Sequence, residues 1–223
     1  PKKDGGWRMV VDFRQLNKYI PHDPYPLPNI NTALASIGAD GTKAKIFSVV
    51  DLLWGFYHIT IQEADRQKTA FTTPIGRYEY TRLPMGMKIS PAVFQRLVDA
   101  TIARNMGGNC IAYVDDVLIY NATEADHLRD MEKLFGILRQ YGMKIKISKT
   151  GFFQTRVQCL GHILTPEGIQ LDKVKVKKLK DLPTPTTERQ LRGVMGVASY
   201  YRRFVKDFAR ISRPIYPKIV EAH

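Results

Sequence analysis

Cysteine and histidine, the residues that build disulfide frameworks and zinc sites, are scarce and scattered in this chain. Its 223 residues include two cysteines, Cys110 and Cys159, which lie in strand-like apolar runs without the Cys-x-x-Cys spacing of metal sites. The five histidines show no ligand spacing either. The sequence therefore indicates neither a disulfide framework nor a zinc site, and it favours a reducing compartment.

Long apolar runs and glycine-rich phosphate loops are also missing. No run approaches the ~20 residues of a transmembrane helix, so we expect no membrane partner. The pattern Gly-x-x-x-x-Gly-Lys-Ser/Thr does not occur, which argues against a P-loop ATPase. The first residues, Pro1-Lys-Lys-Asp4, include neither a start methionine nor an apolar signal region, so we expect the chain to be cut from something longer.

Acidic residues are outnumbered by basic ones. The chain has 34 Lys and Arg against 21 Asp and Glu, a formal net charge of +13, and 44% of its residues are hydrophobic. The apolar content is enough for a core, and the positive charge favours a polyanionic partner, nucleic acid before membrane. Charge alone does not separate catalysis on nucleic acid from binding to it.

Three of the few acidic residues are placed where they can form a metal site. Asp115 and Asp116 lie in the middle of residues 110–120, which are otherwise apolar and β-prone, and this predicts a β-hairpin with the acids at its tip. Asp51 comes at the end of the apolar run 46–50. Three carboxylates delivered by two strands suit hard divalent cations, and two such ions serve phosphoryl transfer at a nucleic-acid 3′ end.

Each of these features also has an ordinary structural explanation. Asp is common in turns, so Asp115 and Asp116 could form a solvated turn. Asp51 could be the N-cap of a helix. The sequence around the three acids decides between these alternatives and a metal site.

The periodicity predicts an α+β chain in which strands alternate with helices. A proline-rich connector follows the first strand, and Asn29 or Asn31 and Ser90 are expected to be helix N-caps. Strands are predicted over residues 7–13, 46–53, 56–61, 144–147 and 157–164, a hairpin over 68–73 and 77–83, and helices over 29–37, 90–102 and 124–141.

The last predicted helix begins with a capping box, Thr187 to Gln190, and has two distinct faces. Apolar residues recur at steps of three and four as far as Phe208. The basic residues fall on roughly the opposite side: Arg192, Arg203, Lys206 and Arg210. This face could be simply solvated, or it could lie along a phosphate backbone.

Several segments together resemble the polymerase domain of reverse transcriptases of the Gypsy-type LTR-retrotransposon and retroviral family. Tyr113-Val-Asp-Asp116 is similar to the Tyr-X-Asp-Asp box, and residues 7–18 are similar to the fingers signature. Residues 83–91 with Phe94-Gln95 resemble the Leu-Pro-X-Gly block, Leu160-Gly-His162 the primer grip, and Tyr200-Tyr-Arg-Arg-Phe204 the thumb segment. These blocks follow one another in order over nearly the whole chain.

The resemblance implies a role for each matching residue. The catalytic and metal-binding residues would be Asp51, Asp115 and Asp116, with the backbone of Leu52, holding two Mg²⁺ ions for which Mn²⁺ can substitute. The nucleotide would be bound by Lys2, Lys3, Arg8, Phe56 as steric gate, Met85 where many relatives have Gln, and Lys149. The nucleic-acid contacts would be Leu160, Gly161, Arg192, Arg203, Lys206 and Arg210.

The implied fold is a right-hand polymerase with partial fingers, a palm whose antiparallel sheet is backed by helices, and a helical thumb. Residues 1–22 and 59–89 would form fingers without their N-terminal part, residues 23–58 and 90–166 the palm, and residues 167–223 at least part of the thumb. The chain looks like a fragment of a polyprotein product.

The implied function is DNA synthesis on an RNA or DNA template by two-metal nucleotidyl transfer, with a template-primer duplex and deoxynucleoside triphosphates as partners. One alternative is a domesticated, non-catalytic nucleic-acid-binding protein that keeps the fold, although its acids would be expected to erode and all three are present. Another is an RNA-synthesising palm polymerase, against which the aromatic Phe56 argues. We expect an intracellular protein, in the cytoplasm or in virus-like particles, and the sequence leaves its oligomeric state open.

Overall fold

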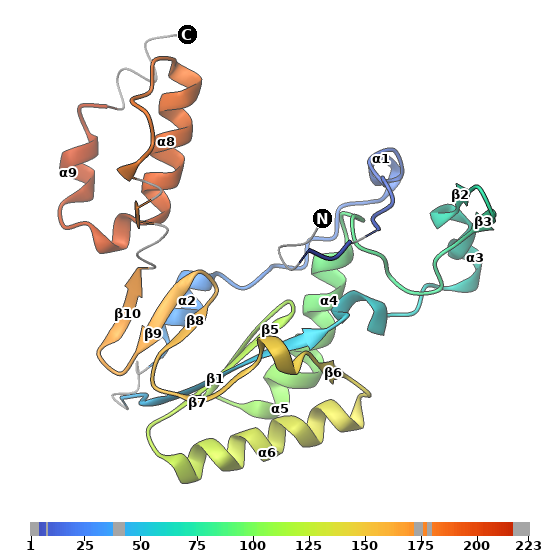
Figure 1. Cartoon of the computed structure of the whole chain (residues 1–223), viewed down its shortest axis with the longest axis horizontal. Coiled ribbons are helices and arrows are strands. Elements are labelled where there is room, and N and C mark those ends of the chain that lie inside the picture. Colours follow the sequence, from blue (N-terminus) through green and yellow to red (C-terminus); the bar gives the residue numbers. More distant parts are fainter. Residues whose placement is uncertain (1–4, 8, 38–42, 172–175, 178–179, 216–223) are drawn as a thin grey trace. The chain divides into compact units, whose positions relative to one another are not determined.

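The computed structural model describes residues 5–7, 9–37, 43–171, 176–177 and 180–215, except for the side chain of Arg203 (Figure 1). The chain divides into two compact units, residues 1–170 and 171–223. Among the described residues, no helix combines the length and apolar character needed to cross a membrane.

The first unit is built on an antiparallel sheet with β1 (Ile46–Leu53) at its centre. β1 pairs with β5 (Asp116–Asn121) on one side, and β5 pairs with β4 (Cys110–Tyr113). On its other side β1 pairs with two short strands, β6 (Lys144–Ile145) and β7 (Gly151–Gln154). The predicted hairpin 110–120 and the predicted strand 46–53 are therefore both confirmed.

Helices cover one face of this sheet. They are α4 (Ser90–Val98), which continues through a π-helical segment (Asp99–Ala103) into α5 (Arg104–Met106), and α6 (Glu124–Gln140), which runs along the sheet in Figure 1. Alternate residues of the strands point to this face and meet the helices in one apolar core. Its fully buried members include Val50, Val117 and Ile119 from strands and Phe94, Val98, Ile102 and Leu134 from helices.

The opposite face of the sheet has a second, smaller core. Phe47, Leu118 and Tyr120 pack there against α2 (Ile30–Ala35) and against a hairpin of β8 (Val157–Cys159) and β9 (His162–Thr165). β10 (Gly168–Leu171) pairs with β9. Asn29 caps α2 by accepting from the backbone of Asn31 and Thr32, as predicted.

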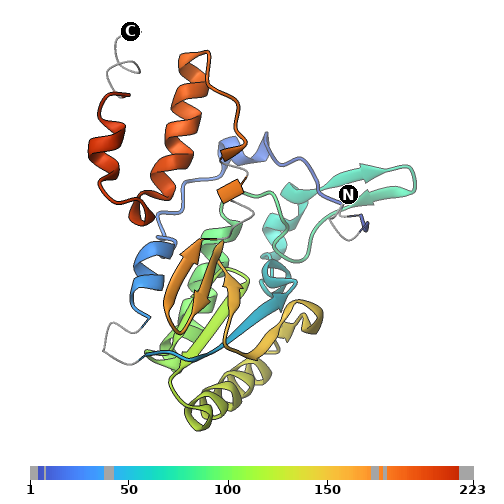
Figure 2. The same ribbon diagram turned by 60° about the vertical axis from the view of Figure 1, so that its left-hand side comes forward.

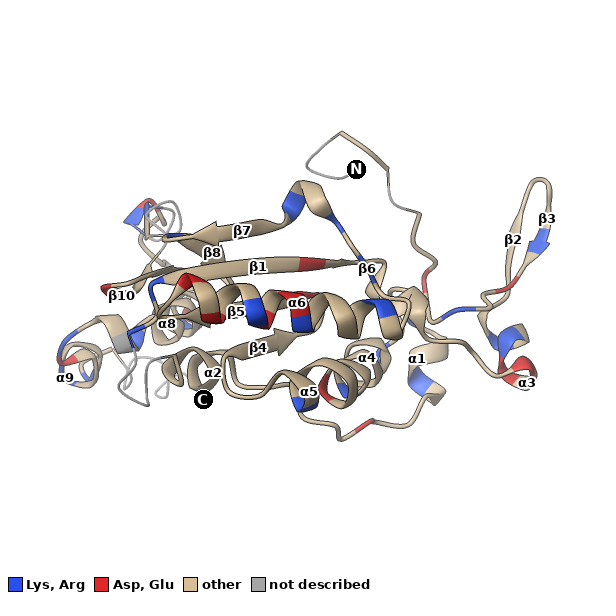
Figure 3. Cartoon of the chain, turned by 90° about the horizontal axis from the view of Figure 1, so that it is seen from below, with Lys and Arg blue, Asp and Glu red and all other residues tan. Residues whose placement is uncertain are grey.

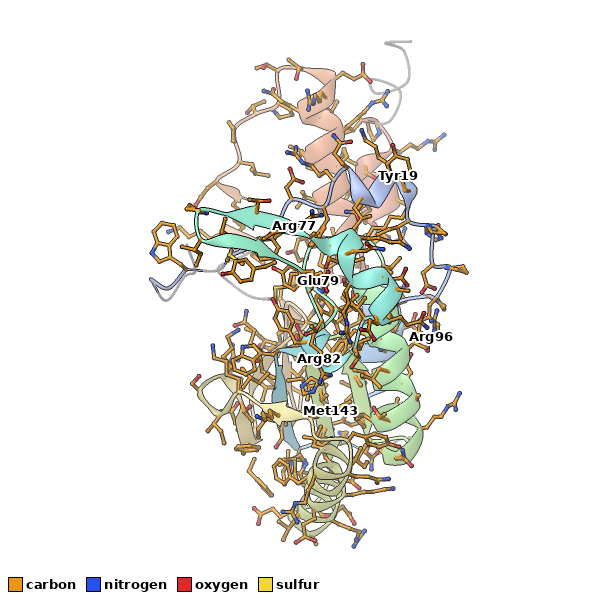
Figure 4. All side chains as sticks on the ribbon, turned by 90° about the vertical axis from the view of Figure 1, so that its right-hand side faces the viewer. Tyr19, Arg77, Glu79, Arg82, Arg96 and Met143 are labelled. Atoms are coloured by element: carbon orange, nitrogen blue, oxygen red, sulfur yellow. The ribbon has the colours of Figure 1, made fainter. Side chains whose placement is uncertain are left out.

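A hairpin of β2 (Phe71–Thr73) and β3 (Gly76–Tyr78) extends away from the main sheet (Figure 2). The hairpin itself was predicted, but its strands are shorter than expected. Two short helices, α1 (Leu16–Tyr19) and α3 (Glu63–Arg66), belong to the same region. Arg82, labelled in Figure 4, donates to the carbonyl of His58 at 3.3 Å and to Thr60 Oγ1 at 3.0 Å, which ties this region to the segment that follows β1.

Three predictions in this unit are wrong. Residues 9–13 form no strand, because alternation alone does not supply a partner for the backbone, and Trp7 is 82% exposed. Residues 55–58 form a 3₁₀ helix where a strand over 56–61 was expected, since Trp54 at φ +56° turns the chain out of the sheet. Residues 157–164 form two strands, because Leu160 and Gly161 both adopt positive φ and make a two-residue turn.

The expected cap of α4 is also wrong. The hydroxyl of Ser90 donates to the carbonyl of Pro84 at 2.8 Å, and Ile89 occupies the N-cap position without a side-chain bond. The buried serine therefore fixes the preceding loop to the helix. In contrast, α6 begins with Thr123 as a true cap, which accepts from the backbone of Asp126.

In the second unit, α8 (Glu188–Tyr200) begins with the predicted capping box of Thr187 and Gln190. The predicted single helix to Phe208 is wrong, because α8 ends at Tyr200, a 3₁₀ turn follows (Arg202–Phe204), and α9 (Phe208–Ser212) begins separately. Val205 is extended and Asp207 is left-handed at φ +56°, a conformation that Asp tolerates better than most residues. Apolar spacing of three and four fits two short helices as well as one long helix.

Candidate active site

The acidic residues of β1 and β5 lie side by side on the sheet face opposite α4 and α6. Asp51 is the cross-strand partner of Asp116, and Asp116 is in turn the partner of Tyr113 on β4. The acidic position on β1 in Figure 3 is Asp51, since this strand contains no other Asp or Glu. Two-residue alternation places Asp51, Asp116 and Tyr113 on the face that carries Phe47 and Leu118 further along the strands.

Two like charges directly opposite each other in a sheet repel. Burial raises the pKa of Asp116, and the charge of Asp51 raises it further, while the ammonium of Lys149 acts in the opposite direction. Lys149 Nζ lies 3.5 Å from Asp51 Oδ2, and the Asp51 side chain is 20% exposed. The lysine follows β6, and the backbone N–H of Lys146 donates to the carbonyl of Asp51 at 2.8 Å, which fixes this segment beside the acids.

Asp115 lies in the turn between β4 and β5, one residue from the acid pair. Its carbonyl accepts from the backbone N–H of Leu52 at 2.8 Å, so the turn is joined to β1 beside Asp51. The turn needs a left-handed residue, and Val114 supplies it at φ +49°. A β-branched residue in this conformation is strained, typically by ~1–2 kcal/mol.

Gly55 allows the Asp115 side chain to lie where it does. A Cβ at Gly55 would be 2.0 Å from Asp115 Oδ1 and 2.7 Å from the ring of Phe94. This carboxylate oxygen is buried against the glycine. Gly55 thus matters because the carboxylate approaches its backbone closely, a role that the sequence analysis missed. The sequence feature that could have indicated this role is the position of Gly55 shortly after the strand that carries Asp51.

The chemistry of the donors suits a hard divalent cation. Asp51, Asp115 and Asp116 offer only oxygen, which is the ligand type that Mg²⁺ and Mn²⁺ accept. Within the described part of the chain, however, no three acidic, His or Cys side chains are grouped as a ready metal site. The backbone brings the three acids together, and Asp51 and Asp116 are the pair that already faces each other. A cation between these two would relieve their repulsion.

The structure describes some of the other residues predicted to contact a nucleotide. Phe56 lies in the 3₁₀ helix Gly55–His58, and its ring meets Phe94 edge-on at 5.6 Å, so it is partly a core aromatic. Met85 is half-buried in the loop before α4. Asn17 holds this loop, because its amide donates to the carbonyl of Gly86 at 2.9 Å and accepts from the backbone of Lys88 at 2.8 Å. Lys2, Lys3 and Arg8 lie outside the described residues.

The residues predicted to contact nucleic acid belong to both units. Leu160 and Gly161 form the β8–β9 turn of the first unit. Arg192 on α8 is paired with Glu188, whereas Arg210 on α9 lies 3.5 Å from Asp207. Lys206 is exposed between α8 and α9, and the side chain of Arg203 is not among those that the structure describes. Because α8 ends at Tyr200, the expected single basic helix face does not exist.

The sequence and the fold both match known proteins. Residues 1–164 match the family described as reverse transcriptase (RNA-dependent DNA polymerase). The Pol polyprotein of transposon opus from Drosophila melanogaster is 38% identical over 217 residues, which cover 96% of this chain and 21% of that protein. The Pol polyprotein of transposon gypsy from the same organism is 41% identical over 208 residues, 93% of this chain and 20% of its own length. The chain thus spans about a fifth of these relatives.

Solved structures of reverse transcriptases are also similar to this chain. The foamy viral protease-reverse transcriptase in complex with double-stranded DNA matches all of this chain and 38% of its own, with a TM-score of 0.89 and 32% identity. The same viral protein in complex with an RNA/DNA hybrid matches with a TM-score of 0.80 and 31% identity over all of this chain and 29% of its own. The right-hand polymerase fold implied by the sequence is confirmed by these neighbours. The chain belongs to the reverse transcriptase family.

Proposed function

We propose that this chain is the polymerase part of a reverse transcriptase and extends a DNA primer on an RNA or DNA template. The observation that supports this most directly is the cross-strand pair of Asp51 and Asp116, with Asp115 in the adjoining turn. A pair of repelling, partly buried carboxylates costs stability and gains nothing for binding a polyanion. Its presence fits a site that binds cations for catalysis.

In this proposal Asp51, Asp115, Asp116 and the backbone carbonyl of Leu52 hold two Mg²⁺ ions, or Mn²⁺ in their place. Bound divalent ions would lower the pKa of the primer 3′-hydroxyl and neutralise the phosphates of the incoming nucleotide. The chain's own contribution is to place oxygen ligands on rigid strands, so that little rearrangement is needed at the moment of reaction.

The incoming nucleotide is proposed to be a deoxynucleoside triphosphate. Lys149 forms an ion pair with Asp51, and its side chain is 58% exposed, so it can also reach a phosphate. Phe56 and Met85 are proposed to bound the sugar and base, and Lys2, Lys3 and Arg8 to hold the phosphates. The Phe56 ring is partly supported by Phe94, which would keep it in a fixed position.

The nucleic-acid partner is proposed to be a template-primer duplex. The foamy viral relatives were solved with double-stranded DNA and with an RNA/DNA hybrid, and the net charge of +13 suits a polyanion. The β8–β9 turn at Leu160 and Gly161 and the basic residues of the second unit would contact its backbone: Arg192, Arg203, Lys206 and Arg210. Base pairing with the template would then select the sequence.

A primer-extension assay on an RNA template with Mg²⁺ tests this function. Asp51→Asn and Asp115→Asn should each abolish extension while leaving duplex affinity within about threefold, because other residues bind the duplex. Asp126→Asn, a carboxylate at the start of α6, serves as the matched control and should retain full extension. Near-parental extension by either site variant would refute the proposal, and an inactive parent that binds the duplex would favour a non-catalytic binding protein.

The preference for deoxynucleotides has its own test. Overpacking typically costs ~1–3 kcal/mol, so a 2′-hydroxyl against the Phe56 ring should lower kcat/KM by roughly five- to 150-fold. Phe56→Val should therefore shift the dNTP to rNTP ratio of kcat/KM toward ribonucleotides. If Phe56 only fills the core, both rates fall together and the ratio stays constant, which would remove this residue from the nucleotide site.

A further inference from the structure

The buried amide of Gln95 connects helix α4 to the turn that carries Asp115. Gln95 is fully buried, and its Oε1 accepts from the backbone N–H of Val114 at 2.7 Å. Its Nε2 donates to the carbonyl of Ala112 at 3.0 Å. The one side chain therefore bonds to the backbone on both sides of Tyr113, on the approach to the acids.

These bonds act where the backbone is strained. Val114 has φ +49°, a conformation that a β-branched residue adopts only when its surroundings hold it there. Of the residues beside it, Leu52 fixes the carbonyl of Asp115, and Gln95 fixes the N–H of Val114. The turn is thus held from the sheet and from the helix.

A second set of contacts determines which way the Gln95 amide points. Asp99 Oδ1 accepts from Gln95 Nε2 at 2.9 Å, and Asp99 Oδ2 accepts from the hydroxyl of Tyr25 at 2.6 Å. With its amino group held by a carboxylate, the amide must present its oxygen to Val114. Tyr25 itself is held by Arg96, labelled on α4 in Figure 4, whose guanidinium lies 4.9 Å from the centre of the tyrosine ring.

The local helix geometry permits this arrangement. Asp99 is the first residue of the π-helical segment that follows α4, and such segments are frequent at functional sites. Asp99 has two partners on different elements, the helix residue Gln95 and the connector residue Tyr25. A series of hydrogen bonds therefore runs from Tyr25, in the connector between α1 and α2, through Asp99 and Gln95 to Val114, in the turn that carries Asp115.

We propose that Gln95 is a positioning residue for the proposed polymerase reaction, and that Asp99 and Tyr25 orient it. In this role Gln95 bonds to the backbone of Ala112 and Val114 and holds the Val114 turn, which positions Asp115 and Asp116 beside Asp51. This inference rests on the proposed function, because it assigns Gln95 to the chemistry of that site.

Gln95→Met tests the proposal, since it keeps the length of the side chain and removes all three hydrogen bonds. Losing a residue that orients metal ligands typically costs about 10–100-fold in activity. We expect kcat for dNTP incorporation to fall by that factor, with KM for the dNTP and duplex affinity within about twofold of the parent. Asp99→Asn should show a smaller loss of kcat, and Tyr25→Phe the smallest.

Thr101→Val is the matched control. Thr101 is also buried on the same run of helix, but its hydroxyl donates only to the carbonyl of Leu97, at 2.8 Å, within the helix. This variant loses a buried hydrogen bond without touching the turn, so its thermal stability should fall while kcat stays parental. A kcat loss in Thr101→Val equal to that in Gln95→Met would overturn the proposal, because the effect would then be general loss of stability.

A second readout does not depend on polymerisation. Hydrogen exchange of the Val114 amide should become at least tenfold faster in Gln95→Met and stay unchanged in Thr101→Val. An unchanged kcat together with unchanged exchange overturns the inference, and so does faster exchange with parental kcat. If Gln95→Met does not fold, Asp99→Asn decides in the same two assays. An inactive parent would refute the proposed function alone, while the exchange result would still decide whether Gln95 holds the turn.

Discussion

Replacing Asp116 by Asn should stabilise the metal-free protein, although it should destroy the site. Cross-strand partners have Cβ atoms about 4.5–5.5 Å apart, and two unit charges about 5 Å apart at an effective dielectric of about 20 repel by roughly 3 kcal/mol. The ammonium of Lys149, 3.5 Å from Asp51, offsets part of this repulsion. We therefore expect a net gain of about 1 kcal/mol, which corresponds to a rise in Tm of about 2–4 °C for a chain of this size.

Divalent metal should reverse this order. A ligand that binds only the folded state adds RT ln(1 + [L]/Kd), which is about 1.4 kcal/mol when its concentration is tenfold above Kd. The parent should gain this stabilisation from Mg²⁺, and Asp116→Asn should lose most of it. The order of the two Tm values should therefore reverse: the variant melts above the parent in EDTA and below it in saturating Mg²⁺.

Thermal unfolding followed by circular dichroism provides the measurement. Glu132→Gln is the control, because it removes one negative charge from an exposed position of α6 and so reproduces the change in net charge away from the acids. It should not raise the Tm in EDTA. If Asp116→Asn melts below the parent in EDTA, or gains as much from Mg²⁺, then Asp51 and Asp116 do not repel as their register implies and the metal assignment falls with it.

Three further predictions concern the surroundings of the site. Gly55→Ala should lower the free energy of unfolding by about 1–3 kcal/mol and reduce primer extension more than tenfold, because its Cβ would lie 2.0 Å from a carboxylate oxygen of Asp115. Gly108→Ala, which has open space around it, should have little effect in the same assays. Burial lowers the pKa of His127, so below about pH 6.5 the unfolded chain binds a proton that the folded chain does not. Urea unfolding should therefore show a free energy of unfolding that falls between pH 7 and pH 5 by up to ~1.4 kcal/mol per pH unit, with a flatter profile for His127→Gln. An identical profile for the two proteins would contradict the lowered pKa of His127. Burial raises the pKa of Cys110 and of Cys159 to about 12, so mass spectrometry after iodoacetamide treatment at pH 8 should find both thiols unmodified until denaturant is added, and rapid labelling of the native chain would show that the strands open.

The elements nearest the site follow from the sequence because their local patterns and their tertiary surroundings agree. The run ending at Asp51 is apolar and β-branched, and it became the central strand with the predicted limits. The hairpin at Asp115 and Asp116 was predicted from its apolar flanks, and α6 from its helical spacing. The family could be identified for a similar reason, since its motifs are short, ordered segments that need no knowledge of contacts.

Predictions failed where the backbone leaves the regular regions. Leu160 and Asp207 adopt positive φ without being glycine, and each lies where a predicted strand or helix is interrupted, while Trp54, also at positive φ, precedes the predicted strand 56–61 that is replaced at its start by a 3₁₀ helix. The periodicity of apolar residues continues through such a residue, so it predicts one element where two exist. The apolar pattern carries no information on the sign of φ, so it does not show where the backbone turns.

What the sequence by itself determined is the identity of the acids, the strands that deliver them and the family, because these depend on residue type and order. Only the tertiary structure decided that Asp51 and Asp116 face each other across two strands, that Gly55 admits the carboxylate of Asp115, and that Gln95 on the preceding helix bonds to the turn. Each of these contacts depends on strand register or on close packing between distant segments. Both arise when the whole chain buries its apolar residues together, and neither is encoded in a local stretch.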